Sequence, residues 1–235
     1  MKYQLKKNCI YCFQPIGKRQ RYHIVQQSIG GTLMYPFACE RHNYDLGGVL
    51  EAKTIKDYWV NFAITKLGLK NFRIDPAFAP DSRQNRYILR VLPDGSEKVV
   101  PPITDPITYR IIAKIAFESA ALFIGDEIFL PTFDGYRGFI LTGKPDLKGK
   151  MIIRCCRDYP WEPRHLIEFS PSQRQQEFAV EVRLFNAYVF AVFFMHPVRF
   201  PNIVAAQVEI DLEKGKTSFW ALPVGAGKWE FVGGY

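Results

Sequence analysis

Residues 9–51 read CIYCFQPIGKRQRYHIVQQSIGGTLMYPFACERHNYDLGGVLE. Two close pairs of metal-binding side chains, Cys9 with Cys12 and Cys39 with His42, each enclose two intervening residues, and 26 residues separate the pairs. Tetrahedral zinc takes four thiolate or imidazole ligands, and this short spacing lets one turn offer two of them to the same ion. The alternative, scattered buried cysteines plus a surface histidine, leaves the two equal spacings unexplained. The stretch therefore predicts a structural Zn²⁺ site formed by these four residues.

The local structure around these pairs is predicted to run strand, strand, helix. Residues 22–25 are short, apolar and partly β-branched, and form a predicted strand that carries His23; residues 33–37 form a second extended segment. A helix is expected to begin near Cys39, because apolar residues recur at steps of three and four as far as Leu67, with an interruption at residues 53–54. Gly68 is a plausible end for it.

The rest of the chain predicts a helix followed by antiparallel sheet. Residues 72–84 are rich in Asp, Pro and Ser and suggest a linker, and residues 93–96 suggest a hairpin turn. The clearest helix opens at Asp105-Pro106 and closes at Gly125, and a shorter one is expected over 131–141. The predicted strands are 151–156, 166–169, 178–185, 188–195, 204–212 and 217–222, with hairpins at 186–187 and 213–216.

These elements predict an α+β fold with three parts: a zinc-binding ββα unit over 1–70, a connecting segment over 71–104 and an α+β domain over 105–235. The chain has 235 residues, 48% hydrophobic and 15% aromatic, which is typical of a globular protein. It contains no run of about eighteen apolar residues, and its first residues lack the apolar core of a signal peptide. Three of its five cysteines are assigned to zinc, which argues against a disulfide framework, so we expect a cytoplasmic protein.

Positive charge is concentrated at the N-terminal end. The net charge is +8, and residues 1–75 hold 12 Lys or Arg against 5 Asp or Glu, whereas residues 76–235 hold 19 against 18. Such a local excess is expected where a protein meets phosphates, although a positive balance can also serve solubility alone. We therefore predict that nucleic acid contacts the basic residues around the first cysteine pair, namely Lys6, Lys7, Lys18, Arg19 and Arg21.

Eleven ordered positions within residues 9–51 carry a resemblance to a known family. They are Cys9, Cys12, His23, Ile24, Val25, Gly30, Gly31, Cys39, Asn43, Gly47 and Glu51. Their order and spacing resemble the HNH endonucleases, also called ββα-metal or His-Me-finger nucleases, in the branch with C-x2-C, [D/E]-H-I-[I/V]-P, L-G-G and C-x2-C-N-x3-G-x3-E. The match covers about a fifth of the chain, and residues 112–119 are similar to a helix that often follows this unit.

The resemblance implies a metal-dependent endonuclease that cleaves DNA. It makes His23 the general base, and imidazole suits proton transfer near neutral pH. It places Asn43 on a catalytic Mg²⁺ or Mn²⁺ ion, for which oxygen ligands are usual. Gly47, one helical turn later, would leave room for a phosphate. Glu51 is a further turn away, about 12 Å from Asn43 at about 1.5 Å per residue, which is too far to share one ion, so we expect it to brace the fold or basic residues rather than to catalyse.

The chain also departs from the family pattern. Tyr22 stands where the family has an acid that is often a metal ligand, so Asp45 or Glu40 would have to replace that acid. Gln26 replaces a proline, His42 replaces the fourth zinc cysteine, and residues 32–38 hold no counterpart of the Asn that orients the base. Two alternatives therefore stay open: a degenerate zinc module that binds nucleic acid or protein without cleaving, and a structural zinc domain that regulates the C-terminal part. Neither His165 nor His196 has a partner motif, and both are predicted to be structural.

Overall fold

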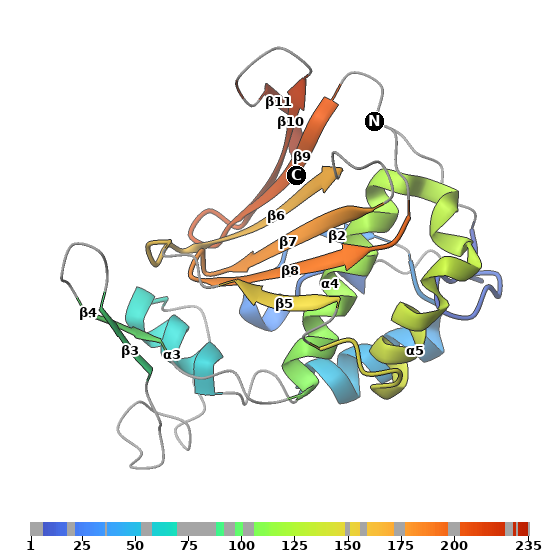
Figure 1. The fold of residues 1–235 in the computed structure, drawn as a ribbon, viewed down its shortest axis with the longest axis horizontal. Coiled ribbons are helices and arrows are strands. Elements are labelled where there is room, and N and C mark those ends of the chain that lie inside the picture. The colour runs from blue at the N-terminus through green and yellow to red at the C-terminus, as the bar shows by residue number, and fades with distance from the viewer. Residues whose placement is uncertain are drawn as a thin grey trace.

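The computed structural model describes residues 7–17, 22–35, 37–52, 58–69, 88–91, 97–100, 106–148, 151–155, 159–171, 177–196, 203–223, 228 and 230–234. Helices and antiparallel sheet are mixed in it, which confirms the α+β class (Figure 1). Among these residues, no helix combines the length and the apolar character needed to cross a bilayer.

A seven-stranded antiparallel sheet forms the C-terminal half. Its strands are β5 (Ile152–Cys155), β6 (Arg164–Pro171), β7 (Phe178–Leu184), β8 (Tyr188–Phe194), β9 (Ile203–Asp211), β10 (Lys216–Pro223) and β11 (Glu230–Gly234). Their order is β11-β10-β9-β6-β7-β8-β5. The six predicted strands are all present with small shifts of their ends, and β11 was not predicted. β6 is longer than expected because it pairs along its length with both β7 and β9.

Both hairpins predicted in this sheet are present. β7 ends at Leu184, one residue early, because Phe185 and Asn186 each take φ 53°, a left-handed conformation that turns the chain into β8. Between β9 and β10, the Asp211 carboxylate accepts the main-chain N–H groups of Glu213 and Lys214 at 3.0 and 2.9 Å. Such a side-chain bond is a typical device of tight turns.

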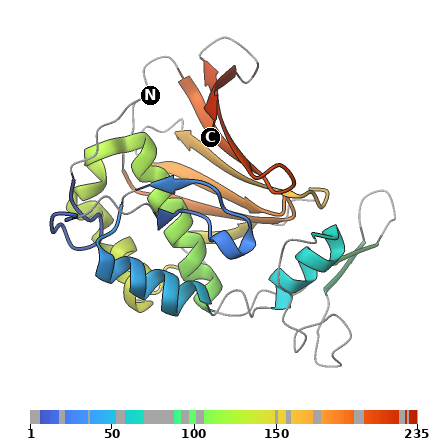
Figure 2. The ribbon, with the colours of Figure 1, turned by 180° about the vertical axis from the view of Figure 1, so that it is seen from behind.

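The helix α4 (Pro106–Ile124) lies at the centre of the molecule. One side packs on the sheet, where every second residue of β7 is buried. The N-terminal strands and helix lie on its other side, as Figure 2 shows from behind. Because α4 is covered on both sides, 15 of its 19 residues are buried. A 3-10 turn (Gly125–Phe129), a second (Pro131–Phe133) and the helix α5 (Asp134–Thr142) follow, so the helix expected over 131–141 begins three residues late.

The N-terminal unit has the predicted order of strand, strand and helix. β1 (Tyr22–His23) pairs with β2 (Met34–Tyr35), so both strands are shorter than expected. The helix expected from Cys39 to Leu67 differs in detail: α1 (Glu40–Tyr44) passes directly into the π-helix η2 (Asp45–Glu51), and α3 (Tyr58–Leu67) is a later segment. A π-helical segment inside an α-helix is rare and often marks a functional site. Residues 53–54, where we expected an interruption, lie outside the described residues.

The connecting segment contributes the predicted hairpin of β3 (Ile88–Val91) and β4 (Glu97–Val100). Its turn and the linker expected over 72–84 lie outside the described residues. One continuous cluster of buried side chains includes Ile24 of the N-terminal unit, Ile112 of α4 and Val182 of β7. The division at residues 70 and 104 stays a prediction.

Candidate functional site

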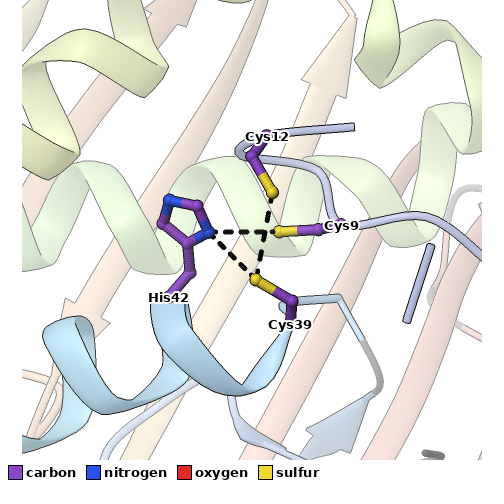
Figure 3. A group of neighbouring side chains, drawn as sticks. All are labelled: Cys9, Cys12, Cys39 and His42. Carbon is purple, nitrogen blue, oxygen red and sulfur yellow. Dashed lines mark hydrogen bonds between the residues drawn. The ribbon is translucent and has the colours of Figure 1, made fainter. Parts of the chain in front are cut away.

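The four predicted zinc ligands lie together. Cys9 and Cys12 come from one tight turn, Cys39 precedes α1 and His42 lies in its first turn (Figure 3). The turn is closed by the N–H of Phe13, which donates to the carbonyl of Cys9 at 2.8 Å, and Phe13 itself takes φ 63°. This turn brings the thiols of Cys9 and Cys12 close together.

The distances within the cluster suit a tetrahedral ion. The four ligand atoms all lie within 4.8 Å of one another. The Sγ atoms of Cys12 and Cys39 are 3.9 Å apart, and His42 Nδ1 lies 3.6 and 3.2 Å from the Sγ atoms of Cys9 and Cys39. With zinc–sulfur bonds of about 2.3 Å, tetrahedral geometry places neighbouring sulfurs about 3.8 Å apart. The cluster could therefore hold a metal ion such as zinc.

The electrostatic setting of the cluster differs between its members. Burial raises the pKa of the Cys9 thiol to about 12. Burial also opposes ionisation of Cys39, but N–H groups at the start of α1 together with the thiols of Cys9 and Cys12 outweigh it and lower the pKa of that thiol. Burial and the neighbouring Arg41 lower the pKa of His42, which favours the neutral imidazole that binds metals.

A separate cleft of about 360 Å³ contains the predicted catalytic residues. Its lining includes His23 from β1 and Asn43 and Gly47 from the helical segment that begins at α1. His23 Nδ1 lies 2.8 Å from the main-chain carbonyl oxygen of Gly31. Because a carbonyl only accepts hydrogen bonds, Nδ1 carries the proton and Nε2 is left as the basic nitrogen. The contact fixes which nitrogen of His23 is the donor, in a cleft that the amide of Asn43 also lines.

The imidazole of His23 is thus oriented by a main-chain carbonyl, that of Gly31, rather than by an Asn side chain. A Cβ atom added at Gly31 would lie 1.9 Å from the carbonyl oxygen of Val25, a distance that no side chain tolerates. The N–H of Gly31 also donates to the carbonyl of Gln26 at 2.9 Å. The Gly-Gly pair in the sequence signals this close approach of main chain to main chain.

The C-terminal sheet supports the loop that carries Gly31. His165 of β6 is fully buried, and its Nε2 lies 2.8 Å from the carbonyl oxygen of Ile29. Its Nδ1 accepts the N–H of Phe185 at 3.0 Å. The hydroxyl groups of Thr32 and Thr217 lie 2.6 Å apart. His165 therefore has the structural role predicted for it, and this role extends to the cleft.

The acid at the cleft is not one of those expected to replace the family's acid. Glu40 is exposed, and Asp45 lies 3.9 Å from Arg41 and lines a different cavity of about 420 Å³. Among the described residues, the acid that lines the His23 cleft is Glu51. Its carboxylate lies 2.9 Å from the Nζ of Lys114, a buried residue that the sequence did not single out. Tyr22 also lines the cleft, and burial raises the pKa of its phenol, which keeps it neutral.

The predicted nucleic-acid contacts fall mostly beyond the described part of the chain. Lys6, Lys18, Arg19 and Arg21 lie outside the described residues. Lys7 is exposed, and its carbonyl accepts the N–H of Ile16 at 2.8 Å. Contact of these side chains with DNA stays a prediction.

Comparisons with protein-family models, with curated proteins and with solved structures find no match to this chain. The resemblance to HNH endonucleases is therefore carried by residues 9–51 alone.

Proposed function

We propose that this protein is a metal-dependent endonuclease that hydrolyses DNA phosphodiester bonds. A Zn²⁺ ion held by Cys9, Cys12, Cys39 and His42 would be structural, and a Mg²⁺ or Mn²⁺ ion at the His23 cleft would be catalytic. The observation that carries the proposal is the 2.8 Å contact between His23 Nδ1 and the Gly31 carbonyl, in a cleft that Asn43 also lines. A positioned base and a nearby oxygen ligand are what hydrolysis of a phosphodiester requires.

In this proposal, His23 Nε2 takes a proton from a water molecule. The water oxygen attacks phosphorus, and the bond from phosphorus to the leaving sugar oxygen breaks. Asn43 would hold the cation, which would supply positive charge to the phosphate and the leaving oxygen. A Cβ at Gly47 would meet no atom within 4 Å, so this wall of the cleft leaves space for the phosphate.

Asn43 is the proposed cation ligand from this chain. An amide oxygen alone is a poor site for Mg²⁺, which is usually bound by one or two carboxylates together with phosphate and water. Glu51 lines the same cleft as Asn43, but its carboxylate lies 2.9 Å from Nζ of Lys114, as expected of a residue that braces a basic side chain. We propose that the cation is bound weakly, by Asn43 together with phosphate and water, because Tyr22 supplies no carboxylate.

A second candidate function is a zinc module that binds nucleic acid without cleaving it. The neutral phenol of Tyr22 at the cleft favours this alternative, because it replaces the acid of the related pattern.

Nicking of supercoiled plasmid separates the two functions. The zinc-loaded protein is incubated with plasmid and Mg²⁺, Mn²⁺ or EDTA, and binding is measured in parallel with a labelled duplex. The nuclease proposal expects nicking with Mg²⁺ or Mn²⁺, more with Mn²⁺, and none with EDTA. The control is His196→Ala, which removes a histidine paired with Glu127 outside the cleft and should leave nicking unchanged. Binding without nicking under every condition would favour the binding module.

A further inference from the structure

Lys114 is a buried cation in the middle of α4, with 4% of its surface exposed. Its Nζ lies 3.0 and 3.2 Å from the main-chain carbonyl oxygens of His23 and Ile24, where β1 ends. The same atom lies 2.9 Å from Glu51 Oε1, at the end of η2, and 2.9 Å from Glu118 Oε2, one turn later on α4. Four acceptors from three segments therefore share the three N–H groups of one ammonium.

The surroundings of Lys114 keep it charged. A buried charge is costly unless oppositely charged groups and hydrogen bonds compensate it. Burial opposes the charge here, but Glu118 and Glu51 outweigh it and raise the pKa of Lys114. Glu118 is held in turn by the hydroxyl of Tyr11, which donates to Oε1 at 2.7 Å. Tyr11 lies between Cys9 and Cys12, so this network also reaches the turn of the Cys/His cluster.

Two of the four acceptors of Lys114 belong to residues that line the cleft, on different walls. His23 comes from β1, whereas Glu51 ends the helical segment that carries Asn43. The general base and the proposed cation ligand Asn43 can act together only if these walls keep a fixed separation. An error of about 1 Å in such a geometry can reduce a rate by about 100-fold.

We propose that Lys114 is a positioning residue of the cleft: its ammonium ties the strand of His23 to the helix end of Glu51 and thereby holds the His23 imidazole against the Gly31 carbonyl. The expected effect on DNA cleavage rests on the proposed function, whereas the expected effect on the His23 tautomer does not. Lys114 itself is enclosed by its four acceptors and would touch neither DNA nor the catalytic ion. A buried ion pair that only stabilises the fold would leave the His23 tautomer unchanged when it is replaced.

Arg110 provides a matched control on the same helix. It lies one turn before Lys114, and it also donates to main-chain carbonyls, those of Ile140 at 3.0 and 2.8 Å and Leu141 at 2.7 Å. These acceptors belong to α5 rather than to the walls of the His23 cleft. The variants Arg110→Met and Lys114→Met therefore each remove a cation that donates to main-chain carbonyls. Only Lys114→Met removes contacts to the walls of the His23 cleft.

The test is long-range ¹H–¹⁵N NMR of the histidine side chains in the full-length zinc-loaded protein, together with kcat and KM for DNA cleavage. The wild-type protein and Arg110→Met should show His23 as a single tautomer with the proton on Nδ1. Lys114→Met should show averaged nitrogen signals at His23, and its kcat should fall by about 10-fold to 100-fold with KM changed less than about threefold.

A second variant covers the case in which Lys114→Met does not fold. Lys114→Met/Glu118→Gln removes the cation together with one carboxylate and keeps an oxygen acceptor for Tyr11. It too should lose the single tautomer. An unchanged tautomer and kcat in either folded variant would overturn the inference, as would an equal effect of Arg110→Met. If Lys114→Met loses the single His23 tautomer that the wild type shows, but the wild type cleaves no DNA, the positioning role of Lys114 is supported and the proposed nuclease function is refuted.

Discussion

His165 offers a quantitative test of how the sheet supports the cleft. Its imidazole is fully buried; Nδ1 accepts the N–H of Phe185, and Nε2 faces the carbonyl of Ile29. These two partners require the neutral form of the imidazole, because a proton on Nδ1 would point at the N–H of Phe185 and replace a hydrogen bond with a clash of two donors. Burial lowers the pKa of His165 to about 4, from an ordinary value of 6.5.

This pKa difference makes the free energy of unfolding depend on pH. Below pH 6.5, the unfolded chain binds a proton at His165 that the folded chain does not bind until about pH 4. The unfolded state is therefore favoured progressively as pH falls through this window, and stability rises with pH. Each pKa unit corresponds to about 1.4 kcal/mol, so the loss between pH 7 and pH 4 is about 3 kcal/mol from this residue.

Urea unfolding of the wild-type protein and of His165→Gln at pH 7, 5.5 and 4 measures this contribution. Other titrating groups, including the Cys/His cluster, are present in both proteins. The difference between their free energies of unfolding at each pH therefore isolates the contribution of His165. The wild-type advantage should shrink by about 3 kcal/mol between pH 7 and pH 4. If the difference in the free energy of unfolding between the wild type and His165→Gln stays constant from pH 7 to pH 4, His165 is not held neutral against the carbonyl of Ile29 and the reasoning is refuted.

Three further predictions concern the cleft and the metal cluster. Gly31→Ala should lower the free energy of unfolding by about 1–3 kcal/mol or more in urea titrations, because its Cβ would strike the main chain of Val25. Gly47→Ala should keep the wild-type stability and reduce only DNA cleavage. Equal free energies of unfolding for the two variants would contradict this prediction. Metal analysis should find about one zinc per chain in the wild-type protein. Cys39→Ala should lose the zinc, and circular dichroism should show its N-terminal unit unfolded, because structural zinc contributes directly to folding. A wild-type protein that is folded and free of metal would exclude the zinc site. Tyr22→Asp should increase plasmid nicking with Mg²⁺ by adding a carboxylate at the cleft, and a folded, zinc-loaded variant that nicks no DNA would favour the binding module.

Local spacing made part of this structure predictable. The x2 spacing of each ligand pair is set within one turn, so the sequence alone indicated that Cys9, Cys12, Cys39 and His42 would meet. A strand was also predicted over 178–185, and the observed β7 buries every second residue.

Long-range and main-chain features were not predictable in this way. Lys114 lies in an apolar run of α4, and its acceptor at His23 is 91 residues away, so nothing nearby in the sequence identifies its partners. The carbonyl that orients His23 carries no side-chain signature. The π-helical segment η2 has the same apolar spacing as an α-helix over so short a stretch, so the sequence does not distinguish the two.

Single-turnover cleavage of a labelled duplex by the wild-type protein and by His23→Ala tests the central claim most directly. Both proteins are used zinc-loaded, with Mn²⁺ or Mg²⁺, at concentrations that saturate the duplex. A general base contributes about 100-fold to 10,000-fold to a rate, so the His23→Ala rate should fall by at least about 100-fold while the Kd for the duplex is unchanged. Equal rates for the two proteins, or a duplex that is bound and never cleaved, would contradict the assignment of a nuclease with His23 as its base.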